Sequence, residues 1–262
     1  MKKPLLEVIF SSEKRKNVLL LLRDGAQEME VLLRSLDTTR QALLPQLKTL
    51  ERHYLIIHYD DSYELTTIGK LVVDKMKPLL GTLGIFDKDI EYWGTRDLDF
   101  IPTQLHARLR ELEPCNLVTT IPTAEICEPS KHALENARRS TFQASVTTFL
   151  FPNFTSILEN FKDHKVSMWL VISEELLTKI KEGQNEHLKT LLRSEQNKLY
   201  LYPKRMGFVS FGHNDFSFMM RIFNKTGTYD HKYVSSDSPS ALIWAKELFE
   251  HYLRDSVPVT EI

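Results

Sequence analysis

The sequence of 262 residues has little cysteine, no long apolar run and no excess of one charge. Cys115 and Cys127 form no CxxC pair, and no cluster of cysteine and histidine has the spacing of a structural zinc site. No segment approaches the roughly 20 apolar residues that span a bilayer, and the N-terminal stretch lacks the small-residue cleavage site of a secretory signal. The sequence therefore predicts a cytoplasmic protein without a membrane segment, a metal or a cofactor.

The near absence of net charge limits how the chain could bind nucleic acid. The formal net charge is −1, so such binding must come from a local patch. Residues 1–80 hold 13 Lys and Arg against 11 Asp and Glu, a net of +2. Because the chain exceeds the roughly 100–150 residues of a common domain, we expect two domains.

Residues 1–80 begin with two helical patterns. Ser11 and Ser12 are plausible caps for a leucine-rich helix that ends at Gly25, a residue that often closes a helix. A shorter helix follows over 27–36, with its apolar residues at spacings of three and four. These helices provide an apolar surface on which a third helix can pack.

The third helix is two-faced. With Thr39 as its N-cap and about 100° per residue, Leu43, Leu47 and Leu50 fall on one side. Pro45 lies in the second turn, where it removes a backbone donor, and this predicts a kinked or late-starting helix. The opposite side carries Gln41, Pro45, Lys48 and Arg52.

The next stretch has the pattern of a hairpin. In "YLIIHYDDSYELT", two arms rich in β-branched and aromatic residues flank a polar tip. Helices followed by a hairpin describe a winged helix-turn-helix, in which the third helix enters the major groove of DNA. There, Arg and Lys can reach guanine acceptors or phosphates, and Gln can bond to adenine.

The runs "TTRQALLPQLKTLERHYLI" and "YELTTIGKLV" resemble the winged helix domains of archaeal ArsR-like transcription regulators, over about residues 5–78. One departure concerns the wing tip: many wings are basic, whereas Asp60 and Asp61 would be repelled by phosphate. The tip therefore either stands off the DNA backbone or contacts a protein. The resemblance implies DNA-binding positions at Thr38, Thr39, Arg40, Gln41, Pro45, Gln46, Lys48, Tyr59, Ser62 and Tyr63.

A linking helix is predicted over 67–80. It begins at threonine caps and is expected to stop near Pro78, Gly81 and Gly84. Its apolar stripe suits either pairing with a twin helix in a homodimer or packing on its own winged domain. We expect a linker over 81–95.

Residues 96–262 alternate between helical and strand patterns. Helices are predicted in "IPTQLHARLREL", "EPSKHALENARRS", "NFTSILENFK", "EELLTKIKEG", "EHLKTLLRSE" and "SPSALIWAKELFEHYLR". Strands are predicted in "SVTTFLF", "KVSMWLVIS", "KLYLY", "RMGFVSFG" and "FSFMMRIFN", with turns at "GHND" and "NKTG". The fold class is therefore α+β or α/β, with a winged helix-turn-helix domain at 1–80 and a mixed α/β domain at 96–262.

The second half is similar to the middle domain of methanogenesis regulatory proteins, archaeal transcription regulators with the same winged N-terminus. The most diagnostic phrases are "GTYD" at 227–230 and "ALIWAKELFEHY" at 241–252, and the similarity covers about residues 95–254. It implies an effector-sensing and dimerising half and supplies no catalytic residue.

A ligand pocket is predicted beside Arg221. This cation lies in the apolar run "FSFMMRIF", where a charge must be paired or must border a pocket. We predict that Arg221, Tyr229 and Asp230 border a pocket for a small-molecule effector. Trp169 and Trp244 are interpreted as core residues.

Other candidate sites fit structural roles better. His187 and Lys189 have the His-x-Lys spacing of phospholipase D enzymes, but Ser194 stands where the motif needs aspartate, in a helical pattern; we predict no enzyme activity. His213 and Asp215 are expected in a hairpin tip. Cys115 and Cys127 are interpreted as free cysteines, with a redox switch as the alternative.

Two functions from different classes follow. The first is a homodimeric transcription regulator that binds a two-fold double-stranded DNA operator through the winged domain and senses an effector with its second half. The second is a protein-interaction adaptor that keeps the winged helix fold without binding DNA. Salt dependence separates them, because phosphate contacts weaken as salt rises.

Overall fold

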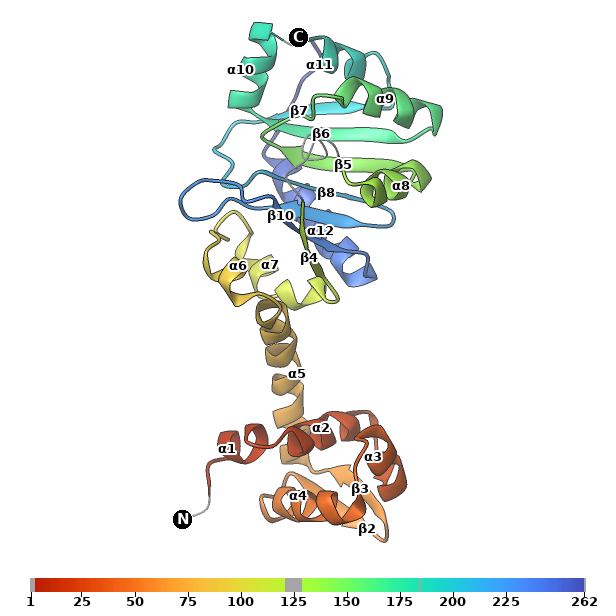
Figure 1. Ribbon diagram of the computed structural model, residues 1–262, viewed down its shortest axis with the longest axis vertical. Helices are drawn as coiled ribbons and strands as arrows, with labels where there is room; N and C mark the ends of the chain where they lie inside the picture. The colour runs from red at the N-terminus through yellow and green to blue at the C-terminus, as the bar shows by residue number, and fades with distance from the viewer. Residues whose placement is uncertain (1–2, 121–128, 184, 262) are drawn as a thin grey trace. The chain divides into compact units, whose positions relative to one another are not determined.

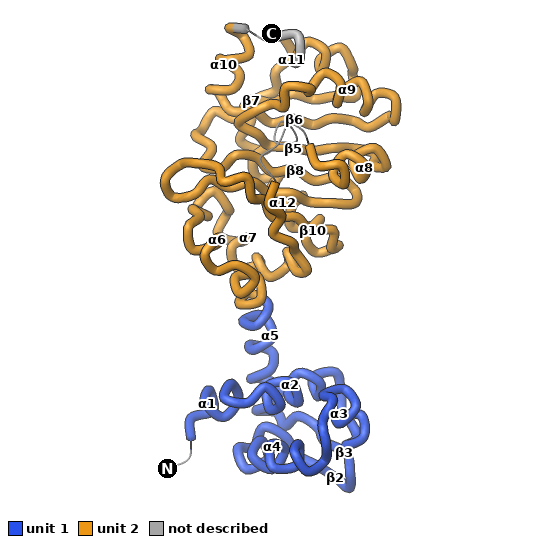
Figure 2. Tube along the Cα trace, in the orientation of Figure 1, with its two compact units in different colours: residues 1–81 blue, residues 82–262 orange. Residues whose placement is uncertain are grey.

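The computed structural model describes residues 3–120, 129–183 and 185–261, without the side chains of 183–187. The chain divides into two compact units, residues 1–81 and 82–262 (Figure 2). The first boundary lies close to the expected end of the winged domain. Residues 82–95, expected as a linker, instead belong to the second unit, because Ile85, Tyr92 and Trp93 are buried in its core. No helix among the described residues combines the length and apolarity needed to cross a membrane.

The first unit is a small helical domain with a three-stranded antiparallel sheet (Figure 1). The sheet order is β1-β3-β2. Its elements are α1 Leu5–Phe10, α2 Glu13–Leu21, a 3₁₀ turn Leu22–Asp24, β1 Gln27–Glu28, α3 Met29–Ser35, α4 Arg40–Arg52, β2 Ile56–Tyr59, β3 Ser62–Leu65 and the first part of α5 Thr67–Asp87. The patterns at 13–36 predicted α2 and α3, whereas α1 was not expected.

Helix α4 begins where its cap predicts. The Thr39 side chain accepts a hydrogen bond from the Ala42 N–H at 3.4 Å, so the helix starts at Arg40 and the expectation of a late start is wrong. Leu43, Leu47 and Leu50 are at most 1% exposed and pack into the core of the unit. The hydrophobic anchor thus keeps Pro45 inside the helix despite the backbone hydrogen bond it removes.

Helix α5 continues past its predicted stop. It runs to Asp87 and contains Pro78, although the proline and the glycines 81 and 84 predicted an end near residue 80. Ile85 is fully buried in the core of the second unit. Local helix propensity is a weak signal that such packing overrides.

The second unit is built on an eight-stranded mixed sheet. The strand order is β11-β7-β6-β5-β8-β9-β10-β4, with β5, β6 and β7 parallel and the other neighbours antiparallel. The bounds are β4 Asn116–Thr119, β5 Phe142–Thr147, β6 Ser167–Ser173, β7 Lys198–Tyr202, β8 Ser210–Asn214, β9 Phe218–Arg221, β10 Lys232–Ser236 and β11 Val257–Pro258. The expected α/β class with an antiparallel part is confirmed.

Helices cover both faces of this sheet. Figure 1 shows α8 and α9 in front of the strands and α12 behind them. Trp244 of α12 packs against Phe218 with ring centroids 5.8 Å apart, so its predicted core role is confirmed. The bounds are α6 Ile90–Gly94, α7 Thr103–His106, a 3₁₀ turn Leu109–Leu112, α8 Lys131–Arg139, α9 Phe154–Asp163, α10 Glu174–Gly183, α11 Asn185–Leu192 and α12 Pro239–Arg254.

Several local predictions for this unit were wrong. The helix expected in "IPTQLHARLREL" is broken into α7 and a 3₁₀ turn. The strand expected at 145–151 is β5, which ends at Thr147, and β8 starts only at Ser210. His213 lies within β8 and is 4% exposed, so it is a core residue and not part of a hairpin tip.

Candidate nucleic-acid interface and the pocket of the second unit

The outer side of α4 presents the polar groups that its helical angle predicts. Gln41, Pro45 and Lys48 are exposed, while the leucine side of the helix is buried. Arg52 is also exposed, one turn beyond Lys48. No ion pair involves Lys48 or Arg52 within the described part of the chain. These side chains are therefore available to an external partner.

Arg40 is bound by the wing. Its guanidinium Nη2 lies 2.5 Å from Asp61 Oδ1, and Nη1 lies 3.4 Å from Asp61 Oδ2, a bidentate pair that joins the start of α4 to the β2–β3 turn. Both side chains remain about half exposed, at 54% and 50%. Because a carboxylate is also favourable near a helix N-terminus, the acidic tip has a role inside the domain.

Gln46 and Tyr63, both predicted DNA contacts, point elsewhere. Gln46 is half-buried, and its Oε1 accepts a hydrogen bond from the Ser12 hydroxyl at 3.2 Å. Tyr63 is 6% exposed and stacks on His58 with ring centroids 5.5 Å apart. Burial raises the pKa of Tyr63. Both residues make contacts inside the domain, Tyr63 as a buried side chain and Gln46 as a half-buried one.

The remaining predicted positions lie at the two ends of this surface. Thr39 is exposed but uses its hydroxyl as the helix cap, and Thr38 is half-buried. Tyr59 is 68% exposed at the end of β2 and pairs in register with the half-buried Ser62 of β3. The surface thus consists of the outer side of α4 with Tyr59 of the wing.

A second side-chain contact joins the wing to α4. His58 Nδ1 is 2.7 Å from Glu51 Oε1, which joins β2 to the last turn of α4. With the Arg40–Asp61 pair, it leaves Lys48 and Arg52 as the cations of this surface that have no acidic partner in the described residues. The positive patch is accordingly small.

In the second unit, Arg221 borders a pocket of about 130 Å³ between the sheet and the helices α8 and α9. Tyr229 lies near Arg221, which lowers its pKa, but burial has the larger effect and raises the pKa overall. Neither Tyr229 nor Asp230 is among the described residues that line the pocket. Of the three residues predicted to border the pocket, Arg221 thus lines it, while Tyr229 is a hydrogen-bond partner of Arg221 outside the described lining.

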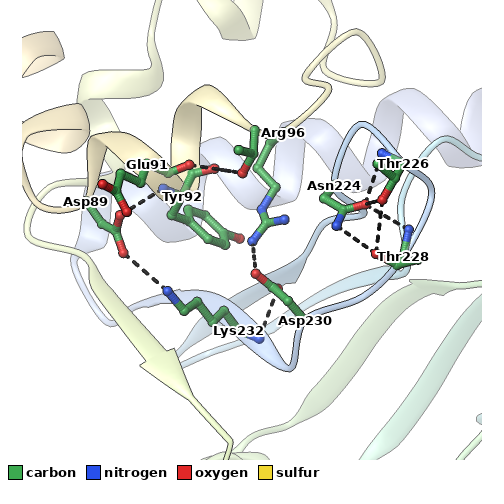
Figure 3. Close-up of polar contacts among 10 residues, drawn as sticks. Asp89, Glu91, Tyr92, Arg96, Asn224, Thr226, Thr228, Asp230 and Lys232 are labelled. Atoms are coloured by element: carbon green, nitrogen blue, oxygen red, sulfur yellow. Dashed lines mark hydrogen bonds and ion pairs between the residues drawn. The ribbon is translucent and has the colours of Figure 1, made fainter.

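Asp230 instead forms an ion pair with a buried arginine. It binds Arg96, whose side chain is 1% exposed and whose guanidinium lies 4.0 Å from the centroid of the Tyr92 ring. Lys232 Nζ lies 3.4 Å from Asp89 Oδ2 in the same cluster (Figure 3). The hydrogen bond from the Tyr92 N–H is the main reason that the pKa of Asp89 is lowered. These contacts fasten the loop before β10 to α6.

The loop before β10 also has internal support. The Asn224 Oδ1 accepts hydrogen bonds from the N–H groups of Thr226 and Thr228 at 3.1 and 2.9 Å (Figure 3). Gly227 has a φ of +75°, which glycine adopts without strain. The "GTYD" phrase therefore encodes a turn and its anchor.

The remaining predicted sites have structural surroundings. Cys115 is 3% exposed, and burial raises the pKa of its thiol; Cys127 lies outside the described residues, so the redox switch stays untested. Leu188 and Leu191 are fully buried on α11, as the helical pattern around the His-x-Lys spacing predicts. The side chain of residue 187 is outside the described part.

Two family models match the chain in sequence order. Residues 3–84 match the N-terminal domain of the methanogenesis regulatory protein FilR1, and residues 126–255 match the middle domain of the same protein. The chain belongs to the FilR1 family. The two FilR1 domains correspond to the winged unit and to the larger part of the eight-stranded unit.

A curated relative agrees with this assignment. The methanogenesis regulatory protein FilR1 of Methanothrix harundinacea (strain 6Ac) is 24% identical over 264 residues, which cover 97% of this chain and 58% of the relative. The chain thus spans little more than half the length of that FilR1 protein.

Two solved structures resemble this chain, each with a TM-score below 0.5. TrmBL2, described as an archaeal chromatin protein with a novel mode of DNA binding, has a TM-score of 0.43 at 14% identity and covers 97% of both chains. The phospholipase D family member Nuc from Salmonella typhimurium has a TM-score of 0.40 at 11% identity and covers 56% of this chain and 99% of its own. Both TM-scores are too low to support an argument about this FilR1-family chain.

Proposed function

We propose that this protein is a transcription regulator that binds a double-stranded DNA operator through its winged unit. The observation that carries the proposal is the outer side of α4, where Gln41 and Lys48 stand exposed on a helix anchored by three buried leucines. A helix held in this way can enter a major groove, with glutamine reading adenine and lysine binding phosphate or guanine.

The family relationship supports this function. The FilR1 relative is named as a regulatory protein, and the FilR1 N-terminal model covers the whole winged unit up to residue 84. The resemblance to archaeal ArsR-like winged domains adds the expectation of a homodimer on a two-fold operator. In this proposal the second unit senses a small-molecule effector and shifts the equilibrium for operator binding.

The same surface also permits an adaptor function. The Arg40–Asp61 pair reduces the positive charge that DNA binding uses. A protein partner could bind the remaining surface, with Tyr59 as an exposed aromatic anchor. DNA binding is the better-supported function because the exposed polar residues of α4 are cationic and amide groups.

The test starts from genomic fragments. Full-length protein is mixed with sheared DNA of the source organism, retained fragments are sequenced, and their affinity is measured by fluorescence anisotropy across a salt series. Log affinity should fall linearly with log salt, and Lys48→Ala should reduce the salt slope by about 1 while weakening binding to all fragments. Gln41→Ala should instead relax sequence preference, by about 1–3 kcal/mol at one base pair.

Lys70→Ala is the matched control, because Lys70 is an exposed lysine on a different helix, α5. This variant should leave affinity and salt slope unchanged. If retention is insensitive to salt and to Lys48→Ala, the DNA-binding proposal is wrong and the adaptor function replaces it.

A further inference from the structure

The strand register places one row of small and polar side chains on the face of the second-unit sheet that α8 and α9 cover. Directly paired residues of antiparallel strands point to the same face, so Thr147, Ser210 and Arg221 form a row across β5, β8 and β9. The next row contains Ser145 and Gly212, and a Cβ on Gly212 would lie 2.7 Å from the Ser145 hydroxyl. Small side chains on these rows leave the pocket open.

The walls above these rows are apolar. Phe149, Leu150 and Phe151 line the pocket from the segment between β5 and α9, Phe154 lines it from the start of α9, and Leu134 lines it from α8. The volume of about 130 Å³ is close to that of an engineered cavity, about 150 Å³, that binds benzene. The pocket therefore suits an apolar body of about one aromatic ring or a chain of about six carbons.

Arg221 gives the pocket its charge. Among the described residues that line the pocket, Arg221 is the one with a formally charged side chain. No carboxylate in the described part of the chain forms an ion pair with it. Its Nη1 donates to the Ser210 hydroxyl at a long 3.4 Å, and its guanidinium lies 5.7 Å from the Phe151 centroid and 5.2 Å from that of Tyr233. A guanidinium has five N–H donors, so this cation can accept a carboxylate in bidentate geometry.

Other polar groups of the pocket already have protein partners. The Asn214 amide donates to Gln143 Oε1 at 3.0 Å, and its oxygen accepts the N–H of Ser217 at 2.9 Å. The Thr147 hydroxyl donates to the Phe149 carbonyl at 2.7 Å. The Arg221 guanidinium has the Ser210 hydroxyl and the Tyr229 side chain as hydrogen-bond partners, which leaves N–H donors of its five for a ligand, and a single cation matches a single negative charge.

We propose that this pocket binds a small monocarboxylic acid, with the carboxylate on Arg221 and an apolar body between the sheet, α8 and the phenylalanines. The proposal depends on the proposed function only in identifying this acid as the effector. Binding itself is independent of DNA and can be measured without it.

The experiment uses isothermal titration calorimetry on the full chain with benzoate, phenylacetate and hexanoate, each compared with its neutral amide. At least one acid should bind at least tenfold more tightly than its amide. Arg221→Gln should weaken the acid at least tenfold and leave the amide unchanged. Ala133→Leu, which adds volume from α8, should weaken both ligands.

Controls separate the charge from the fold. Arg205→Gln removes an exposed arginine outside the pocket and should bind the acid as the native protein does. Arg221→Lys keeps the charge and should retain the preference for acid over amide, which tests the proposal even if Arg221→Gln does not fold.

Equal binding of acid and amide, or no binding of any of the three acids at millimolar concentration, would overturn the inference. Acid binding by a protein that retains no genomic fragment would support this inference and contradict the DNA-binding proposal. DNA retention without acid binding would have the opposite meaning.

Discussion

His213 is the residue whose ionisation most clearly depends on its surroundings. Its ring lies between Phe142 and Phe249, with centroids 5.3 and 5.9 Å away, and its Nε2 has no hydrogen-bond partner in the described residues. Burial is the main cause that lowers its pKa to about 4, with a smaller contribution from Lys246. A histidine in an unfolded chain has a pKa of about 6.5. The folded second unit therefore keeps this side chain neutral while the unfolded chain takes up a proton.

We expect this difference to make the second unit less stable in acid. Above about pH 6.5 His213 is neutral in both the folded and the unfolded chain, and its contribution to the free energy of unfolding is fully present. This contribution is lost as the pH falls towards about 4, because only the unfolded chain then binds the proton. At pH 5 the loss is about 2 kcal/mol. His213→Phe should remove it, so the free energy of unfolding of the variant relative to the native protein should rise by about that amount between pH 8 and pH 5.

Urea unfolding followed by tryptophan fluorescence measures the free energy of unfolding of the second unit. All three tryptophans, at 93, 169 and 244, lie in residues 82–262. His164→Gln is the control, since His164 is exposed on the surface beyond α9. An unchanged difference between His213→Phe and the native protein at the two pH values would contradict the prediction.

At the scale of elements, the wing and α4 form one charged assembly. The acidic tip, unfavourable for a wing that contacts phosphate, supplies the carboxylate that holds Arg40. Asp60 precedes it with a φ of +54°, a left-handed conformation that aspartate tolerates better than most residues. The tip thus controls how much positive charge the start of α4 presents.

Asp61→Asn should release Arg40 and increase affinity for a retained DNA fragment by a few fold, with a steeper salt dependence. The effect is modest because a half-exposed ion pair contributes about 1 kcal/mol or less. In an Arg40→Ala background the same substitution should have almost no effect, which a double-mutant cycle by fluorescence anisotropy measures.

Asp60→Asn serves as the control for general loss of negative charge. Its effect, whatever its size, should persist in the Arg40→Ala background, because no ion pair joins Asp60 to Arg40 among the described residues. If Asp61→Asn behaves in the same way as Asp60→Asn, the tip does not regulate Arg40.

At the scale of the whole molecule, the sequence left open whether α5 packs on its own winged domain or pairs with the same helix of a second copy. Val73 and Met76 are buried in the winged unit, so one side of the helix packs on its own domain. Ile68, Leu71 and Leu79 remain 49%, 65% and 48% exposed on another side. The helix therefore has apolar surface to spare for a homodimer, which the proposed two-fold operator requires.

The double variant Leu71→Glu with Leu79→Glu should convert the protein from dimer to monomer in sedimentation velocity, because buried like charges would face each other across the interface. Its fold should be retained, since both side chains are solvent-exposed in the single chain. Lys77→Glu, an exposed position on the far side of the same helix, should sediment like the native protein. A native protein that is monomeric at every concentration would contradict the homodimer.

The sequence by itself determined the elements whose signals are local. Leu43, Leu47 and Leu50 predicted the buried side of α4 because helical spacing alone decides which side chains share a face. The caps of α4 and α12, the apolar strand β6 and the hairpin of the wing followed from similar short-range patterns. The sequence also placed an unusual cation, Arg221, in an apolar strand.

Only the tertiary structure decided which groups these elements bring together. Arg40 meets Asp61 across 21 residues, and Arg96 meets Asp230 across 134, so neither pair follows from local spacing. The contacts of Gln46 with Ser12 and of Tyr63 with His58 likewise became known only when these neighbours were placed. Strand order and register arise from long-range packing, and that packing opens a pocket beside Arg221 while it pairs Asp230 with the buried Arg96.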